Sequence, residues 1–250
     1  MAIFAFAVLG AAAVWLGGLN QDEGWYLYAA NLCAEGKMLY RDFFYTQGPE
    51  MPNVYGVFTF VWRTWGLLGA RVFTLILGFA GIVLAAALAR RLAPEGRKGE
   101  AALAVFVLLG CNLYHLYYVA IPKTYALASL VVMIGFFLLF VGKKPVFLLV
   151  AGLALAFAAG TRISLGALLC VVGLWLLLAR RWRPLLWFCI GGFGGLAFLL
   201  GRSILFEELL ERQGRNIGTA AVGVLLFAFG AVLETFGTGT RSISVLALEA

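Results

Sequence analysis

Charged residues are scarce in this chain of 250 residues. Asp, Glu, Lys and Arg together make up 12% of it, whereas they make up about a quarter of a typical soluble domain. The mean hydropathy is +0.97, and long stretches carry no charged residue. This composition excludes an ordinary soluble domain and predicts an all-α membrane protein, a polytopic helical bundle.

Residues that commonly build metal sites are also few. The chain has one histidine, His115, and four widely spaced cysteines without a C-x-x-C pair. Three of the cysteines lie inside apolar runs, where a thiol behaves as a small hydrophobic group. This pattern argues against a zinc site and a disulfide framework. Tyrosines surround His115, so we expect a structural role for it in an interfacial aromatic belt.

The net charge of +7 raises the question of a nucleic-acid partner. The basic residues, however, form short clusters between apolar runs. Such clusters are typical of membrane topology signals, whereas a phosphate-binding stripe would be less interrupted. We therefore predict membrane lipids as partners and no nucleic acid.

Uncharged runs of nearly 20 residues predict about eight transmembrane helices. The runs are 1–21, 72–89, 101–122, 124–142, 145–161, 163–179, 184–201 and 216–233. The first run has no basic leader and further spans follow it, so we interpret it as an uncleaved helix. The run 51–62 is too short to span and suits a helix lying in the membrane interface.

Three basic clusters divide the later spans into pairs and predict the orientation of the chain. They are Arg90/Arg91/Arg97/Lys98, Lys143/Lys144 and Arg180/Arg181/Arg183. Two spans separate each cluster from the next, so all three lie on one side, which the positive-inside rule assigns to the cytoplasm. Residues 20–71 and 202–216 then form two outer loops. If 51–62 were a true span, there would be one more membrane crossing and the acidic loop before it would lie in the cytoplasm. The length of this run argues against a span.

The first outer loop begins with a predicted surface helix within 22–35. Its apolar residues recur at helical spacing on one face: Trp25, Tyr28, Ala29 and Leu32. We expect this face to lie toward the membrane. Asp22 and Glu23 fall in the first turn, where negative charge suits the helix dipole. A second interfacial helix is predicted at 51–64.

Four short motifs follow the first span in a fixed order. They are Asp22-Glu23, the Tyr/Ala-rich stretch with Tyr26, Tyr28, Ala29 and Ala30, then Tyr40-Arg41-Asp42-Phe43, and Gly48-Pro49-Glu50-Met51-Pro52. This set resembles the first outer loop of the GT-C glycosyltransferases. It is closest to the branch of protein O-mannosyltransferases and bacterial aminoarabinose transferases (glycosyltransferase family 39). Arg71 matches an arginine that usually opens the next helix of that family.

The sequence also departs from the family pattern. Glu50 replaces the second proline of the motif, and relatives continue with further helices and often a soluble outer domain. We therefore expect 1–250 to be a single transmembrane module of this kind that is incomplete at its C-terminus.

The resemblance implies an enzyme and its substrates. Such proteins transfer a monosaccharide, with inversion, from a polyprenyl-phosphate-linked donor to a lipid, glycan or protein acceptor. The active site would face outward from a bacterial or archaeal plasma membrane. Asp22 would be the catalytic base, with Glu23 supporting it. The loop residues Tyr40, Arg41, Asp42 and Glu50 would contact donor or acceptor.

The leaving phosphate would need cations, for which Arg71, Lys123 and Arg162 are the candidates. Each is expected where a different helix meets the outer face. No cofactor is predicted with certainty. A divalent metal between carboxylates, as in some relatives, remains an open alternative, although no histidine-rich ligand set is present.

Other interpretations compete with this one. The acidic pair could simply solvate a helix end, and Lys123 and Arg162 could be basic anchors at the membrane surface. The chain could also be a non-catalytic lipid-binding or transport protein, or an inactive fragment of a glycosyltransferase. A transporter would be expected to place polar or broken helices near the midplane, and the centres of these spans carry almost no ionisable residues.

Overall fold

The computed structural model describes residues 1–142 and 144–202, which are helical and contain no β-strand. The helices are α1 (Ala2–Leu16), α2 (Gln21–Ala34), α3 (Glu50–Val57), α4 (Thr59–Leu92), α5 (Lys98–Gly110), α6 (Leu113–Ala120), α7 (Thr124–Val141), α8 (Pro145–Thr161), the 3-10 turn η1 (Ile163–Leu165), α9 (Gly166–Leu178) and α10 (Trp182–Arg202). The predicted span at 216–233 and nearly all of the predicted outer loop at 202–216 lie outside the described residues.

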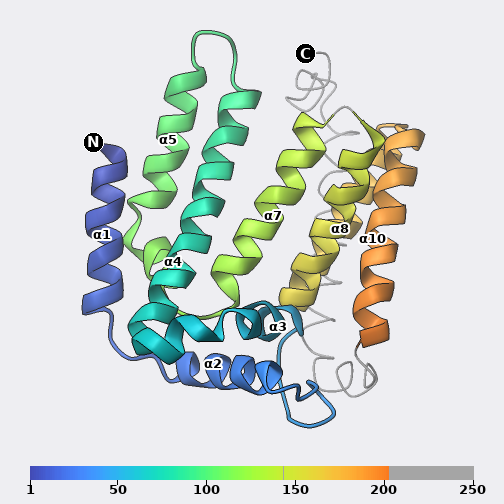
Figure 1. The fold of residues 1–250 in the computed structure, drawn as a ribbon. Coiled ribbons are helices and arrows are strands. Elements are labelled where there is room, and N and C mark those ends of the chain that lie inside the picture. The colour runs from blue at the N-terminus through green and yellow to red at the C-terminus, as the bar shows by residue number, and fades with distance from the viewer. Residues whose placement is uncertain (143, 203–250) are drawn as a thin grey trace.

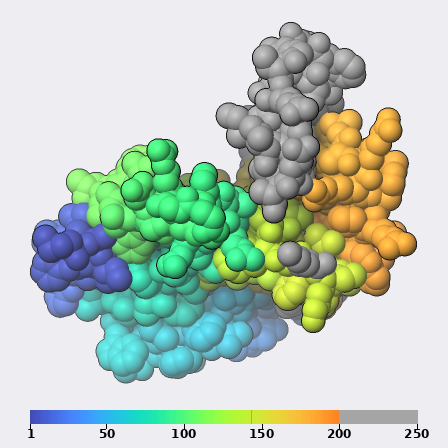
Figure 2. Space-filling model, turned by 90° about the horizontal axis from the view of Figure 1, so that it is seen from above, coloured from blue at the N-terminus to red at the C-terminus, as the bar shows by residue number. Residues whose placement is uncertain are grey.

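The long helices stand side by side, and α2 and α3 lie across one end of them (Figure 1). Helix α4 packs against α5 and α7, and α8 packs against α7 and α10. Seen from above, α1 and α10 lie at opposite margins (Figure 2). We call the end covered by α2 and α3 the α2–α3 end. The predicted order of elements along the chain is observed: an apolar helix, a helix across its end, a loop, a second short helix and a long apolar helix.

Three of the described helices, α4, α7 and α10, are long and apolar enough to cross a membrane. Two pairs qualify only as broken spans: α1 with α2, bent by 90°, and α5 with α6, bent by 68°. Helix α8 and the segment 163–178 are apolar but shorter. The described residues thus contain three to five candidate spans, and the predicted count of eight is not confirmed.

The bend after α1 occurs at an asparagine inside the first uncharged run. Asn20 Oδ1 accepts a hydrogen bond from the Asp22 backbone N–H at 3.0 Å, and the Asn20 N–H donates to Glu23 Oε2 at 3.1 Å. This reciprocal capping starts α2 in a new direction. The predicted span 1–21 therefore ends early, at Leu16.

A second asparagine breaks the predicted span 101–122. Asn112 Oδ1 accepts from the His115 backbone N–H at 3.1 Å and begins α6. The His115 ring Nδ1 lies 3.0 Å from the Leu109 carbonyl oxygen at the end of α5. This contact fits the expected structural role of His115, which joins the two halves of the bend.

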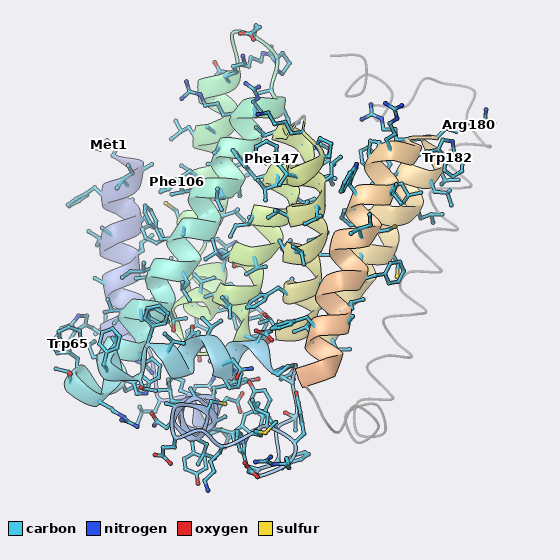
Figure 3. The ribbon with its side chains drawn as sticks, turned by 45° about the vertical axis from the view of Figure 1, so that its right-hand side comes forward. Met1, Trp65, Phe106, Phe147, Arg180 and Trp182 are labelled. Atoms are coloured by element: carbon cyan, nitrogen blue, oxygen red, sulfur yellow. The ribbon has the colours of Figure 1, made fainter. Side chains whose placement is uncertain are left out.

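Helix α4 is divided by Gly66, whose φ of +59° is accessible to glycine at little cost. The part before it, 59–65, continues the second predicted interfacial helix after α3, and the part after it, 67–92, is the span. Trp65 projects outward near the α2–α3 end (Figure 3) and is 65% exposed. An exposed tryptophan is typical of a membrane interface.

The face of α2 that packs against the bundle matches the predicted apolar face only in part. The buried side chains of this helix are Glu23, Tyr26, Leu27, Ala29 and Ala30, so Ala29 of the predicted set is buried, whereas Tyr28 is 62% exposed. Glu23, Tyr26, Leu27 and Ala30 follow the same helical spacing, two residues before the predicted set. Hydropathy alone could not find this face, because it buries a glutamate.

The basic clusters lie at the opposite end from α2 and α3. Arg90 and Arg91 end α4 at its hairpin with α5, and Lys144 precedes α8. Arg180 and Trp182 lie at the same end (Figure 3). The prediction that these clusters share one side is confirmed for the described residues.

Candidate functional site

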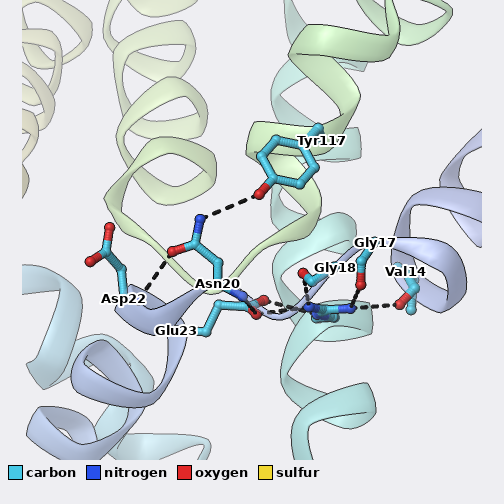
Figure 4. Close-up of polar contacts among 8 residues, drawn as sticks. Val14, Gly17, Gly18, Asn20, Asp22, Glu23 and Tyr117 are labelled. Carbon is cyan, nitrogen blue, oxygen red and sulfur yellow. Dashed lines mark hydrogen bonds and ion pairs between the residues drawn. The ribbon is translucent and has the colours of Figure 1, made fainter.

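Two acidic neighbours at the start of α2 have different environments. Glu23 is buried, with 1% of its surface exposed, while half of the Asp22 side chain (49%) is exposed. Their side chains point in different directions (Figure 4). The two carboxylates therefore have separate partners and separate roles.

Glu23 forms a buried ion pair with Arg71 of α4. Arg71 Nε donates to Glu23 Oε1 and Nη2 donates to Oε2, each at 2.8 Å. Arg71 itself is only 5% exposed. A bidentate pair of this kind fixes both orientation and distance, so it holds the first turn of α2 against α4.

The remaining N–H groups of Arg71 bind the end of α1. Nη1 donates to the carbonyl oxygens of Val14 at 3.1 Å and Gly17 at 2.9 Å, and Nη2 donates to that of Gly18 at 3.0 Å (Figure 4). A guanidinium has five donors, and all are used. The predicted role of Arg71 as a phosphate contact is therefore corrected to a structural one, and Glu23 is its structural partner.

Asp22 pairs with a different cation. Lys123 Nζ lies 2.5 Å from Asp22 Oδ2, and the lysine side chain is only 12% exposed. Lys123 lies in the short link between α6 and α7. The structure therefore brings together the predicted base and one predicted phosphate contact from segments that are distant in sequence.

Arg162, at the end of α8, lies beside the same link. Its guanidinium carbon is 4.5 Å from the ring centroid of Tyr125, a cation–π contact. Arg162 Nη1 also donates to Thr124 Oγ1 at 3.5 Å. Because Thr124 follows Lys123, the two cations meet at the first turn of α7. In the described part of the chain no side chain caps this turn, whose dipole favours an anion.

Tyr26, one turn after Asp22, completes the group. Burial is the main cause that raises the pKa of Tyr26 to about 12; Asp22 and Tyr125 raise it further, while Arg162 lowers it. Its phenol therefore stays protonated at ordinary pH and can donate a hydrogen bond. We call Asp22, Tyr26, Lys123, Tyr125 and Arg162 the Asp22 cluster.

The loop between α2 and α3 returns to the end of α8. The Tyr40 hydroxyl donates to the Gln47 carbonyl oxygen, and burial, followed by the charge of Glu50, raises the pKa of Tyr40. Glu50 is 3% exposed. A β-carbon added to Gly160 would come within 2.9 Å of Glu50 Cγ. Tyr40 and Glu50 are thus placed close to the segment that carries Arg162.

The other two predicted loop residues face solvent. Arg41 Nε and Nη2 donate to Asp42 at 2.9 and 3.0 Å, and 52% of the arginine side chain is exposed. The Met38 backbone N–H also donates to Asp42, at 2.8 Å. Hydrogen bonds from Arg41 and Met38 lower the pKa of Asp42 to about 2. The geometry gives this pair a role in shaping its own loop.

The side chains around Asp22 and Glu23 do not form a site for a divalent metal. Within 1–142 and 144–202 no three His, Cys, Asp or Glu side chains lie together as a metal site would require. Asp22 and Glu23 each bind a basic side chain instead.

Sequence reasoning found Tyr26 only as part of the Tyr/Ala-rich stretch, and it did not single out Tyr125. The packing of α2 against the bundle is what brings both tyrosines to the Asp22 cluster. The capping of α2 did have a signal: Asn20 precedes Glu23 by three residues, as in a capping box.

No family model, curated protein or solved structure matches this chain.

Proposed function

We propose that this protein is a membrane glycosyltransferase that moves a monosaccharide from a polyprenyl-phosphate-linked donor to an acceptor hydroxyl, with inversion. One observation carries the proposal. A half-exposed carboxylate, Asp22, and two cations, Lys123 and Arg162, meet at one end of a helical bundle. They are the groups that this reaction needs, and they lie where α2 and the loop links would meet a lipid headgroup.

The reaction assigns one role to each group. The acceptor oxygen forms a bond to the anomeric carbon while the bond from that carbon to the phosphate oxygen breaks. Asp22 takes the hydroxyl proton, and polyprenyl phosphate leaves with the bonding electrons. Lys123 and Arg162 stabilise the charge that grows on the phosphate. Glu23 and Arg71 position Asp22 by fixing the first turn of α2.

The orientation belongs to the same proposal. We place the α2–α3 end outside a bacterial or archaeal plasma membrane and the basic clusters inside, with about eight spans in the whole chain. Helix α3 has eight residues, far fewer than the roughly 20 required to span a bilayer. A helix this short adds no membrane crossing between the Asp22 cluster and the first basic cluster. This supports placing the Asp22 cluster on the outer side, opposite to the basic clusters.

The direct test is glycosyl transfer in membranes supplied with a panel of polyprenyl-phosphate sugars. The wild type is compared with Asp22→Asn and with a matched control, Glu35→Gln. Glu35 ends the same helix, is exposed, and lies 3.9 Å from Arg63. We expect transfer by the wild type and the control, and its loss in Asp22→Asn with donor binding retained. Equal transfer by all three would remove Asp22 from the mechanism.

A second candidate is a non-catalytic protein that binds phosphate-bearing lipids. One observation favours it: Asp22 is engaged by Lys123 and so is not a free base in this state. A transporter stays a further alternative: transporters commonly break helices near the midplane, and the break between α5 and α6 at Gly110 lies beside Ile82, in the middle part of α4. Donor binding without transfer of any sugar would support the lipid-binding protein.

A further inference from the structure

The exposures of Asp22 and Lys123 differ in a way that bears on donor binding. Of the two side chains, Asp22 is 49% exposed and Lys123 is 12% exposed. The carboxylate is therefore the more accessible partner of the pair. A phosphate oxygen that binds Lys123 Nζ where Asp22 Oδ2 now lies, 2.5 Å from it, must displace the carboxylate.

We propose that Asp22 occupies the place of the donor phosphate, and that the phosphate frees the base by displacing it from Lys123. This inference rests on the proposed function. Carboxylate and phosphate oxygens are both good partners for an ammonium group, so one can replace the other at Lys123. The released carboxylate then has no bound cation and can accept the proton of the acceptor.

The surrounding contacts allow this exchange without moving a helix. Glu23, the next residue, is locked to Arg71 by two hydrogen bonds of 2.8 Å, so the backbone of the first turn stays in place. The half-exposed Asp22 side chain can change rotamer toward solvent. The fixed neighbour thus limits the movement to one side chain.

Arg162 is ready to receive the same phosphate. Its guanidinium makes one hydrogen bond within the described residues, to Thr124 at the long distance of 3.5 Å. Arg71, in contrast, uses all five donors. Asp22, Lys123 and Arg162 together carry a net charge of +1, so the cluster attracts an anion before the exchange.

The exchange imposes an order on the reaction. An acceptor that binds first meets a carboxylate paired with Lys123, which is a poor base. A donor that binds first creates the free carboxylate. Donor binding before acceptor binding is therefore the productive sequence.

Binding of a fluorescent short-chain polyprenyl phosphate, without a sugar, to the purified full chain in detergent tests the inference. We expect Asp22→Asn to bind this probe about three- to ten-fold more tightly, because a competitor is removed. Lys123→Gln should bind it more weakly. Adding Asp22→Asn to Lys123→Gln should then give no gain, and Asp22→Glu, which keeps a carboxylate, should bind nearly as the wild type does.

The control Glu35→Gln removes one negative charge from the same helix and should leave the affinity unchanged. Equal or weaker binding by Asp22→Asn, or a gain that persists without Lys123, would overturn the inference. If Asp22→Asn does not purify as a folded protein, Asp22→Ser serves the same comparison.

The binding assay needs no transfer, so the two proposals can fail separately. Transfer by the wild type with no gain in Asp22→Asn would overturn the exchange alone. A Lys123-dependent gain in a protein that transfers no sugar would support the exchange and overturn the glycosyltransferase.

Discussion

Arg71 and Glu23, 48 residues apart in the chain, share two hydrogen bonds of 2.8 Å in the interior of the protein. The same arginine binds three carbonyl oxygens at the end of α1. One side chain thus joins α1, α2 and α4. The orientation of Asp22 toward Lys123 depends on this junction, because Asp22 and Glu23 belong to the same helical turn.

Removing one partner of this pair should destabilise the protein strongly. Arg71→Met leaves the Glu23 carboxylate buried without its cation, and such changes cost roughly 3–5 kcal/mol. We expect a large fall in the thermal midpoint in detergent, measured by fluorescence. The double variant Arg71→Met/Glu23→Leu removes both charges and should be more stable than either single variant. Equal loss in the double variant would contradict a role for the charge pair.

Asp22 and Glu23 should differ in how their loss affects transfer. Asp22→Asn should lower the rate by about 10²–10⁴-fold, the usual contribution of a general base, at nearly unchanged stability. Glu23→Gln should lower both stability and the amount of folded protein. Rates normalised to folded protein separate the two effects. A similar loss of normalised rate in both variants would argue that both carboxylates take part in the reaction.

The loop between α2 and α3 should depend on Gly48. A β-carbon there would lie 2.0 Å from the Gly160 carbonyl oxygen, and a backbone atom cannot move aside as a side chain can. We expect Gly48→Ala to cost about 1–3 kcal/mol and to expose the loop to proteolysis.

A glycine in open space provides the control for that substitution. At Gly24 of α2 an added β-carbon meets no atom within 4 Å. Alanine has a higher helix propensity than glycine, so Gly24→Ala should stabilise the protein by up to about 1 kcal/mol. We expect a slightly higher thermal midpoint. Tolerance of Gly48→Ala would show that the loop does not dock against α8.

The Arg41–Asp42 pair should keep its loop shape in acid. Its contacts lower the pKa of Asp42 from a usual 3.8 to about 2. A carboxylate with a depressed pKa stabilises the fold above its unfolded pKa and loses that contribution as the pH falls through about 2. A carbon-13 NMR titration of the labelled carboxyl should show this midpoint. Arg41→Gln should move it upward, and an unchanged midpoint would exclude the pair as its cause.

The two ends of the bundle should label from opposite sides of the membrane. In a variant whose four cysteines are replaced by serine, we expect Lys37→Cys to react in intact cells with a membrane-impermeant maleimide. Arg97→Cys should react only after permeabilisation, because its basic cluster faces the cytoplasm. The reverse pattern would place the Asp22 cluster inside and contradict the proposed orientation.

Composition and charge clusters by themselves predicted a helical membrane protein, and they predicted which ends of its helices lie together. An apolar helix can cross a bilayer through its length alone, and clustered arginines and lysines stay at one side whatever the packing. The sequence therefore predicted the helices, the surface segments and the common end of Arg90, Lys144 and Arg180. It failed at Asn20 and Asn112, because hydropathy does not register an uncharged residue that caps a new helix.

Only the tertiary structure decided which charged groups meet. A glutamate beside an aspartate carries no local sign that one will be buried and the other exposed. Arg71 resembled a phosphate ligand in the sequence, and its five bonds appear only when α1, α2 and α4 pack together. Ion pairs between distant segments depend on the direction of each side chain, to within an ångström. Helix packing sets that direction, and it joined Asp22 to Lys123 and Glu23 to Arg71.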